Sequence, residues 1–203
     1  MQNPDQHLPQ HWARKYFTIF AGQSLSIFGS GLVQFALVWY LTRRTGSATV
    51  LATATLAAIL PETLLGPLVG TLVDRWNRRV VMIVADLSIA AVTVALAILF
   101  ATETIQIWHI YLMLLARSVG GIFHYSAMNA STALLVPSDQ LQRVSGINQT
   151  LRAAINIVSP PTGALLLGIL PMQGILFIDV ATAILGTLPL LFLSIPQPVR
   201  ELD

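Results

Sequence analysis

Six long apolar stretches, separated by short polar breaks, dominate this sequence of 203 residues. Each is about 20 residues or longer, which is the length an α-helix needs to cross the hydrocarbon core of a bilayer. We expect them at 17–41, 48–73, 80–100, 109–135, 146–170 and 174–195. Only 10% of the residues are charged, against about 25% in a soluble domain. The sequence therefore predicts an all-α integral membrane protein with six transmembrane helices.

The polar segments divide the chain into a cytoplasmic tail over 1–16, a helical bundle over 17–195 and the start of a cytoplasmic central loop over 196–203. Lys and Arg are spread unequally between the two membrane faces. One face carries Arg14, Lys15, Arg75, Arg78, Arg79, Arg143 and Arg200, and the other carries Arg43 and Arg44. Because Lys and Arg favour cytoplasmic loops, we predict a multi-pass protein of the cell membrane with both termini in the cytoplasm. The short connections predict that consecutive helices are antiparallel neighbours.

Several kinds of partner do not fit the composition. The sequence has no cysteine, which excludes disulfides and thiolate metal sites. Its net charge of +2 is too small for a nucleic-acid-binding surface. His7 and His11 are four residues apart but have no third ligand nearby, so we expect no metal and no cofactor.

The loop after the second stretch carries the strongest local signal. It runs Gly66-Pro67-Leu68-Val69-Gly70-Thr71-Leu72-Val73-Asp74-Arg75-Trp76-Asn77-Arg78-Arg79. Gly66 and Gly70 are four residues apart, a spacing that lets another helix backbone approach closely. Asp74 lies among arginines, and we expect it within salt-bridge reach of Arg78 or Arg143. On physics alone, a positively charged cytoplasmic loop after a packing face is the simplest explanation.

The pattern Gly70-x-x-x-Asp74-Arg75-x-x-Arg78-Arg79 resembles the signature of the major facilitator superfamily between its second and third helices. Asn77 departs from it, because that signature often has glycine there. The form Asp-Arg-Trp-Asn-Arg-Arg resembles the branch with macrolide-efflux proteins and enterobactin exporters. The resemblance implies a bundle of two inverted three-helix repeats, and a loop that latches two halves of a transporter. It implies gate roles for Gly70, Asp74, Arg75, Arg78, Arg79 and, beside them, Arg143.

A second match lies in the fifth stretch, Ser159-Pro160-Pro161-Thr162-Gly163-Ala164. It resembles a degraded form of the Gly-Pro-x-x-Gly-Gly motif of drug antiporters. Each proline removes a backbone donor, so we predict a helix kink at Pro160, Pro161 and Gly163. Proline and glycine are common in membrane helices, so the match has weight only beside the loop motif, where it favours an exporter.

Polar residues recur at steps of three and four in three stretches, which places each set on one helical face. The sets are Gln23, Ser26, Ser30 and Gln34; Arg117, Gly121, His124, Met128 and Ser131; and Asn148, Arg152, Asn156, Ser159 and Gly163. Such faces line a wet cavity or form interhelical hydrogen bonds worth about 0.6 kcal/mol each. A charge in mid-membrane costs at least about 2.5 kcal/mol, so Arg117 indicates a pathway or an ion pair. In the resembling family the first and fourth helices line the cavity, which implies substrate contacts for Gln23, Gln34, Arg117 and His124.

Three acidic residues lie within the stretches. Glu62 follows Pro61 near the middle of the second stretch. We expect it to pair with a cation such as Arg117 or to be protonated. A carboxyl that gains and loses a proton would serve proton-coupled export, so Glu62 is a candidate coupling residue, with a structural role as the alternative. We expect structural roles for Asp86, which would reach the basic loop, and for Asp179, which would reach the outer water.

The sequence thus predicts a secondary active transporter that exports a small amphipathic compound or siderophore by alternating access, driven by protons. Such transporters have two six-helix halves, so we expect an N-terminal half whose partner is a C-terminal half or a second copy. A non-transporting membrane fragment or scaffold is the alternative, and it would have a dry bundle without a polar groove. An intramembrane enzyme fits less well, because Phe28 replaces the leading glycine that a serine nucleophile needs before Gly29-Ser30-Gly31.

Overall fold

The computed structural model describes residues 11–195, which form six α-helices. They are α1 (Trp12–Thr45), α2 (Ala48–Val73), α3 (Arg78–Ala101), α4 (Ile107–Leu135), α5 (Leu141–Ile169) and α6 (Met172–Phe192). The expected central loop and most of the expected tail lie outside the described residues. The six apolar stretches are confirmed as helices. The largest differences are at the starts of α1 and α5, where polar residues extend the helix beyond the apolar stretch.

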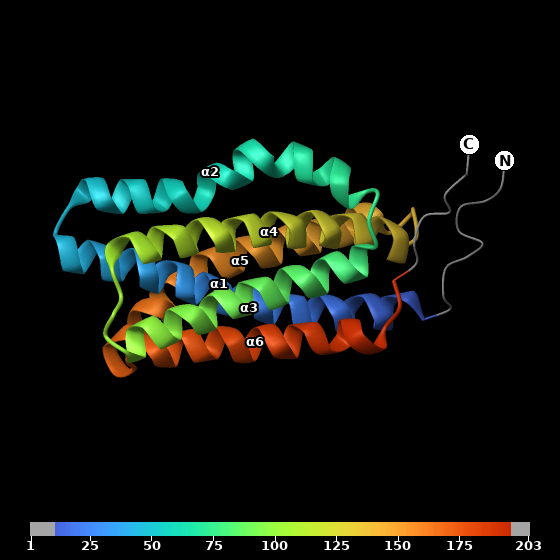
Figure 1. Cartoon of the computed structure of the whole chain (residues 1–203). Coiled ribbons are helices and arrows are strands. Elements are labelled where there is room, and N and C mark those ends of the chain that lie inside the picture. The colour runs from blue at the N-terminus through green and yellow to red at the C-terminus, as the bar shows by residue number, and fades with distance from the viewer. Residues whose placement is uncertain (1–10, 196–203) are drawn as a thin grey trace.

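Within the described residues, four helices are long and apolar enough to cross a membrane, namely α1, α2, α3 and α6. Polar side chains such as Arg117 and Arg152 interrupt the apolar character of α4 and α5. The start of α1 and the end of α6 lie at the same end of the bundle (Figure 1). The helices run back and forth along one long axis, as expected for a protein built to the thickness of a bilayer.

Local sequence explains where the helices stop and start. Gly46 ends α1 in a left-handed conformation with φ of 62°, and its N–H donates to the carbonyl oxygen of Thr42 at 2.9 Å. The side chain of Ser47 then caps α2 by accepting from the N–H of Val50. Asn77 caps α3 in the same way at a φ of −69°, so this position needs no glycine. The departure from the family signature at Asn77 is therefore a helix cap.

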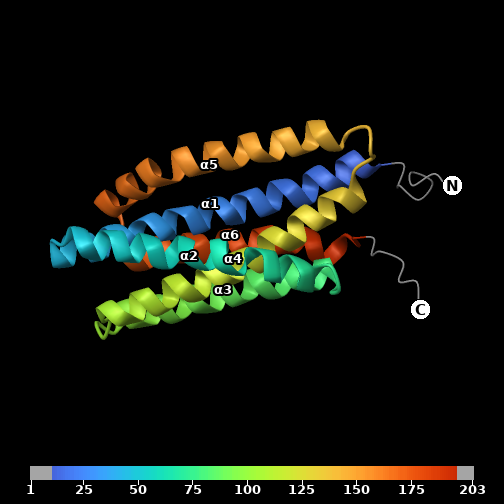
Figure 2. The same ribbon diagram turned by 90° about the horizontal axis from the view of Figure 1, so that it is seen from above.

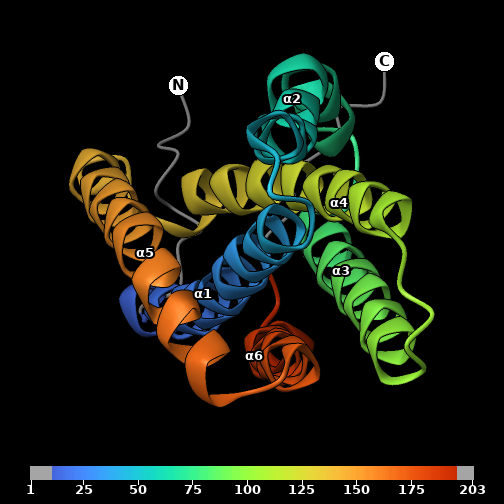
Figure 3. The same ribbon diagram turned by 90° about the vertical axis from the view of Figure 1, so that its left-hand side faces the viewer.

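The helices do not pack in chain order. α1 packs on α6 and α5, α4 packs on α3 and α2, and α3 packs on α6. Figure 2 shows α5 lying along α1, and Figure 3 shows α2 and α5 at the outer edges of the bundle. The expectation that consecutive helices are neighbours is therefore wrong in general. α2 lies against α4 rather than α3.

The closest helix contact uses glycines that the sequence analysis did not select. A Cβ atom added to Gly186 of α6 would lie 2.8 Å from the backbone oxygen of Gly22 in α1. One added to Gly29 would lie 2.0 Å from the hydroxyl of Thr182. By contrast, a Cβ at Gly66 or Gly70 would have no neighbour within 4 Å in the part of the chain described. The small-residue contact within this bundle therefore joins α1 to α6 rather than α2 to another helix.

α2 is one of the least covered helices, since it has, like α5, only four buried residues. Its buried residues are Ala54, Pro61, Val69 and Val73, and Leu64 and Leu68 are each 63% exposed. Figure 1 shows that its second half bends away from the other helices. Pro61 and Pro67 lie inside this helix, and proline is the usual cause of a sharp helix kink.

Two apolar clusters fill the bundle, one toward each end. The first includes Tyr16, Met82 and Leu190, and the second includes Leu37, Leu96 and Leu176. Between them along α1, α3, α4 and α6 lies a layer of buried polar side chains: Gln23, Ser26, Asp86, Thr93, Arg117, His124, Asp179 and Thr187. Burying polar groups is costly unless each one is hydrogen-bonded, so this layer is where the sequence departs from a simple apolar core.

Candidate functional site: a polar groove beside a buried charge layer

A groove of about 220 Å³ lies beside the buried polar layer and is lined by five of the six helices. Its polar lining residues are Ser26, Ser30, Gln34, Glu62, Asp86, Arg117, Ser118, His124, Tyr125 and Arg152. Polar residues of α1 and α4 and Arg152 of α5 therefore meet at one place. The scaffold alternative expected a bundle without such a groove, and transport by this chain stays a prediction.

Arg117 of α4 forms an ion pair with Asp179 of α6, with Nη1 and Oδ2 at 2.6 Å. Thr93 of α3 donates to the same carboxylate oxygen at 2.8 Å, and Arg117 also donates to the Thr93 hydroxyl. Ser30 of α1 donates to the other carboxylate oxygen at 3.0 Å. One carboxylate thus ties four helices together. The expectation that Asp179 reaches outer water is wrong, because its side chain is fully buried.

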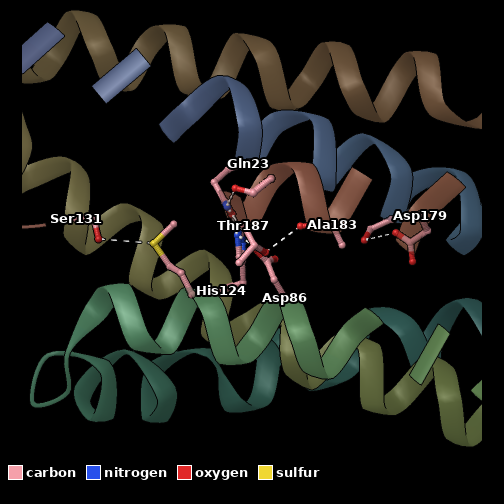
Figure 4. A network of polar contacts seen from close by, with 10 residues as sticks. Gln23, Asp86, His124, Ser131, Asp179, Ala183 and Thr187 are labelled. Atoms are coloured by element: carbon pink, nitrogen blue, oxygen red, sulfur yellow. Dashed lines mark hydrogen bonds and ion pairs between the residues drawn. The ribbon is translucent and has the colours of Figure 1, made fainter. Parts of the chain in front are cut away.

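A second buried network surrounds Asp86 of α3 (Figure 4). Gln23 of α1 donates from Nε2 to Oδ2 of Asp86 at 3.2 Å and to the carbonyl oxygen of Gly186 at 2.8 Å. Nε2 of His124 lies 3.5 Å from Oδ1 of Asp86 and also contacts the side-chain oxygen of Gln23. Thr187 of α6 completes the set. Asp86 was expected to reach the basic loop, and this is wrong because these three side chains hold it inside the bundle.

Glu62 lies on the groove, but it does not pair with Arg117 as expected. The ion pair of Arg117 is with Asp179, and Glu62 is exposed. Across the groove, the guanidinium of Arg152 lies 3.9 Å from the ring centre of Tyr125, a cation–π contact. Arg152 is close enough to Glu62 for a favourable electrostatic interaction. The exposed Glu62 therefore lies near the half-buried Arg152 rather than the buried Arg117.

The predicted cavity residues divide into two kinds. Gln34, Arg117 and His124 line the groove. Gln23 is fully buried behind it and holds Asp86 and His124 in place. On α5, the polar face turns partly toward α1: Tyr16 donates to Asn148 at 2.8 Å, which ties the two helices together.

The proline motif of α5 lies where this helix packs on α1. A Cβ at Gly31 would lie 2.7 Å from the hydroxyl of Ser159, and one at Gly163 would lie 3.0 Å from the ring of Phe35. α5 continues through Pro160 and Pro161 as one helix to Ile169. The motif thus sets a close helix contact, and the kink stays a prediction.

The predicted gate residues lie at the end of the bundle that holds the start of α1. Asp74 Oδ1 lies 3.7 Å from Nη2 of Arg78, which confirms that Asp74 is within salt-bridge reach of that arginine. Arg79 donates to the carbonyl oxygens of Leu190 and Leu191 at the end of α6. Arg75 and Arg143 are exposed. Arg79 therefore anchors the loop to α6, while Asp74 remains at the surface.

A larger groove of about 720 Å³ lies between this loop, α3 and α4. It is lined mainly by apolar side chains, among them Val80, Val84 and Phe123, and Trp76 stacks on Phe123. Arg75 is its one titratable lining residue. Polar chemistry is therefore concentrated in the smaller groove.

The fold, the buried charge layer and the loop motif can be compared with known proteins. The model of the Major Facilitator Superfamily matches residues 19–203. The chain belongs to the major facilitator superfamily. This match covers every helix described above except the first turns of α1.

The relatives of this major facilitator chain place it in the macrolide-efflux branch. It is 41% identical over 196 residues to macrolide efflux protein A of Streptococcus pyogenes, an alignment that covers 95% of this chain and 48% of the relative. It is 40% identical over 161 residues to macrolide efflux protein A of Enterococcus faecalis, covering 78% and 50%. An uncharacterized MFS-type transporter, YfiS of Bacillus subtilis, is 22% identical over 177 residues. The chain spans about half the length of the curated relatives it matches, and the family indicates a transporter rather than an enzyme.

Sequence reasoning missed the α6 contribution to the polar layer of this major facilitator chain. Asp179, Thr182, Gly186 and Thr187 lie within the buried face of α6. Their spacing is helical, and it could have been found by the rule that selected the three other faces. Thr93 of α3 carried no such signal, because it stands alone among apolar residues.

Proposed function

We propose that this chain is the N-terminal six-helix half of a secondary active transporter that exports an amphipathic compound of the macrolide class in exchange for protons. The observation that carries the proposal is the polar groove at the middle of an otherwise apolar bundle. Groups from five helices meet there, including two arginines, a histidine and two carboxylates. Charges at such a depth are costly and mark substrate or ion pathways. The names of the two macrolide efflux relatives supply the substrate class.

The packing supports two inverted three-helix repeats and six membrane crossings. In such a repeat α1, α2 and α3 correspond to α4, α5 and α6. Under this exchange the α1–α6 contact corresponds to the α4–α3 contact, and the α4–α2 contact corresponds to the α1–α5 contact. The α3–α6 contact converts into itself. A bundle with this symmetry has its cavity face on α1 and α4, and it supports alternating access when a second bundle rocks against it.

The open polar groove is an argument for a partner that covers this face of the bundle. In the lipid region every polar backbone and side-chain group needs a partner, and an open groove lacks one. The second half of the transporter, or a second copy of this chain, would cover Gln34, Glu62 and Arg152. The unequal distribution of Arg and Lys supports an orientation with the Asp74 loop in the cytoplasm. In this orientation Asp74, Arg75, Arg78 and Arg79 form the cytoplasmic gate, and Glu62 faces the pathway as a candidate proton carrier.

The test is macrolide transport in liposomes under a proton gradient. The purified chain alone is expected not to transport, because one bundle cannot seal one side while opening the other. Transport is expected when the chain is joined to the second half of macrolide efflux protein A, and it should stop when an ionophore collapses the gradient. Robust transport by a demonstrated monomer would refute the half-transporter proposal. Transport that ignores the gradient would refute proton coupling.

A further inference from the structure

The two buried acids of the polar layer have different kinds of partner. Asp179 is held by Arg117, whose guanidinium stays charged in proteins. The basic partner of Asp86 within salt-bridge distance, among the residues that the structure describes, is His124. Histidine is the side chain that ordinarily changes charge near neutral pH. The Asp86–His124 pair therefore contains a base that can take up and release a proton.

The hydrogen bonds fix the starting protonation of His124. Gln23 uses its two amide hydrogens on Asp86 and on the carbonyl oxygen of Gly186, so its side-chain oxygen faces His124. Nε2 of His124 then faces two oxygens, one of Gln23 and one of Asp86. A ring nitrogen between two acceptors has to carry a hydrogen. The other nitrogen, Nδ1, has no hydrogen-bond partner among residues 11–195, so it can receive a proton.

Thr187 provides a place for a proton on the carboxylate as well. Its hydroxyl has one hydrogen and two acceptors within reach, the carbonyl oxygen of Ala183 at 2.8 Å and Oδ2 of Asp86 at 3.3 Å. The hydroxyl can donate to the carboxylate or turn its hydrogen to the carbonyl oxygen. A proton on Oδ2 of Asp86 could then be donated to the Thr187 hydroxyl, which keeps this contact a hydrogen bond.

The pair is accessible from the groove. Asp86 and His124 both line it. The charged groups around the pair are Glu62 of α2, Arg117 of α4, Arg152 of α5 and Asp179 of α6, and α1 contributes the uncharged Gln23. Arg117 is neutralised by Asp179. Proton uptake by the Asp86–His124 pair would therefore change the net charge of the groove lining beside it.

We propose that Asp86 and His124 together form the proton-binding site that couples export to the proton gradient, an inference that rests on the proposed function. Before uptake, His124 is neutral with its hydrogen on Nε2, and Asp86 is ionised. One proton from water in the groove then binds Nδ1 of His124 or Oδ2 of Asp86, and the pair passes from one negative charge to none. Release of the same proton to the opposite side restores the starting state. The step breaks and forms only N–H or O–H bonds.

The first experiment needs no transport and uses the 203-residue chain in lipid nanodiscs. Infrared difference spectra between about pH 5 and pH 8 should contain a carboxyl protonation band, coupled to a change of the imidazole signal. The isosteric variant Asp86→Asn should lose that band, and His124→Gln should lose the imidazole change. Asp139→Asn is the matched control, the same change at an exposed carboxylate outside the groove, and it should keep both. A band that persists in Asp86→Asn, or that Asp139→Asn removes, would overturn the site.

The second experiment separates the site from the proposed function. In liposomes, the chain joined to its second half should lose uphill macrolide export in Asp86→Asn but retain downhill equilibration, a split that a merely structural role would not produce. Helicity measured by circular dichroism checks that the variant folds. Proton-driven export that survives Asp86→Asn would overturn the coupling role. Titration by Asp86 together with no macrolide movement under any gradient would refute the macrolide proposal and leave the proton site standing.

Discussion

Arg117 and Asp179 join α4 to α6 through an ion pair of 2.6 Å, although they are 62 residues apart in the chain. The pair lies between the two apolar clusters, where both side chains are buried. Neither charge could be left alone there, because an unpaired buried charge has lost its hydration without compensation. The pair therefore links α4 to α6 within the buried polar layer.

We expect Arg117→Met and Asp179→Leu each to lower the free energy of unfolding by on the order of 3–5 kcal/mol, because each leaves one buried charge unpaired. The double variant should recover most of that loss, since it removes both charges and replaces them with apolar volume. Denaturant unfolding in detergent micelles measures all three. Additive losses in the double variant would show that the two residues do not interact.

Gly186→Ala should destabilise the bundle by about 1–3 kcal/mol, because the new methyl group meets the backbone of α1, which cannot move aside easily. Gly70→Ala is the matched control. No atom lies within 4 Å of its new Cβ in the described chain, and alanine is the better helix former by about 1 kcal/mol. Thermal unfolding of both variants checks the difference. Equal losses would contradict the close α1–α6 contact.

Asp74→Ala should reduce transport by the assembled transporter while leaving membrane insertion intact. The side chain of Asp74 is 68% exposed, and an exposed ion pair contributes only about 0–1 kcal/mol to stability. A loss of transport would therefore reflect the gate and not unfolding. The measurement pairs a macrolide efflux assay with unfolding of the same sample. Undiminished efflux would remove Asp74 from the gate.

Cysteines placed at Arg43 and Asp139 should react with an impermeant thiol reagent from opposite sides of the membrane. Both residues are exposed, and they lie at opposite ends of the bundle, beside the α1–α2 turn and the α4–α5 turn. The natural sequence has no cysteine, so each single variant gives an unambiguous signal. Labelling of both positions from the same side would contradict the six-crossing topology.

Much of this architecture is encoded locally and could be predicted. Apolar runs long enough to cross a bilayer specify six helices, because hydrophobic length acts within each segment. Gly46, Ser47 and Asn77 set helix ends through contacts with residues a few positions away. The polar faces of α1, α4 and α5 follow from helical periodicity alone. The Asp74–Arg78 contact is also local, because the two residues flank the short turn between α2 and α3.

The pairing of charges was decided only by tertiary structure. From the sequence we expected Glu62 to pair with a cation such as Arg117 or to be protonated, and Asp86 and Asp179 to reach the membrane faces, because only depth along each helix was known. The actual partner depends on which helix faces which. α6 crosses α1 closely at Gly22 and Gly186, and this crossing brings Asp179 to Arg117 and Thr187 to Asp86. Periodicity specifies which residues share a face of one helix. Which faces of two helices meet is specified by how the helices cross, and the crossing depends on packing between residues far apart in the chain.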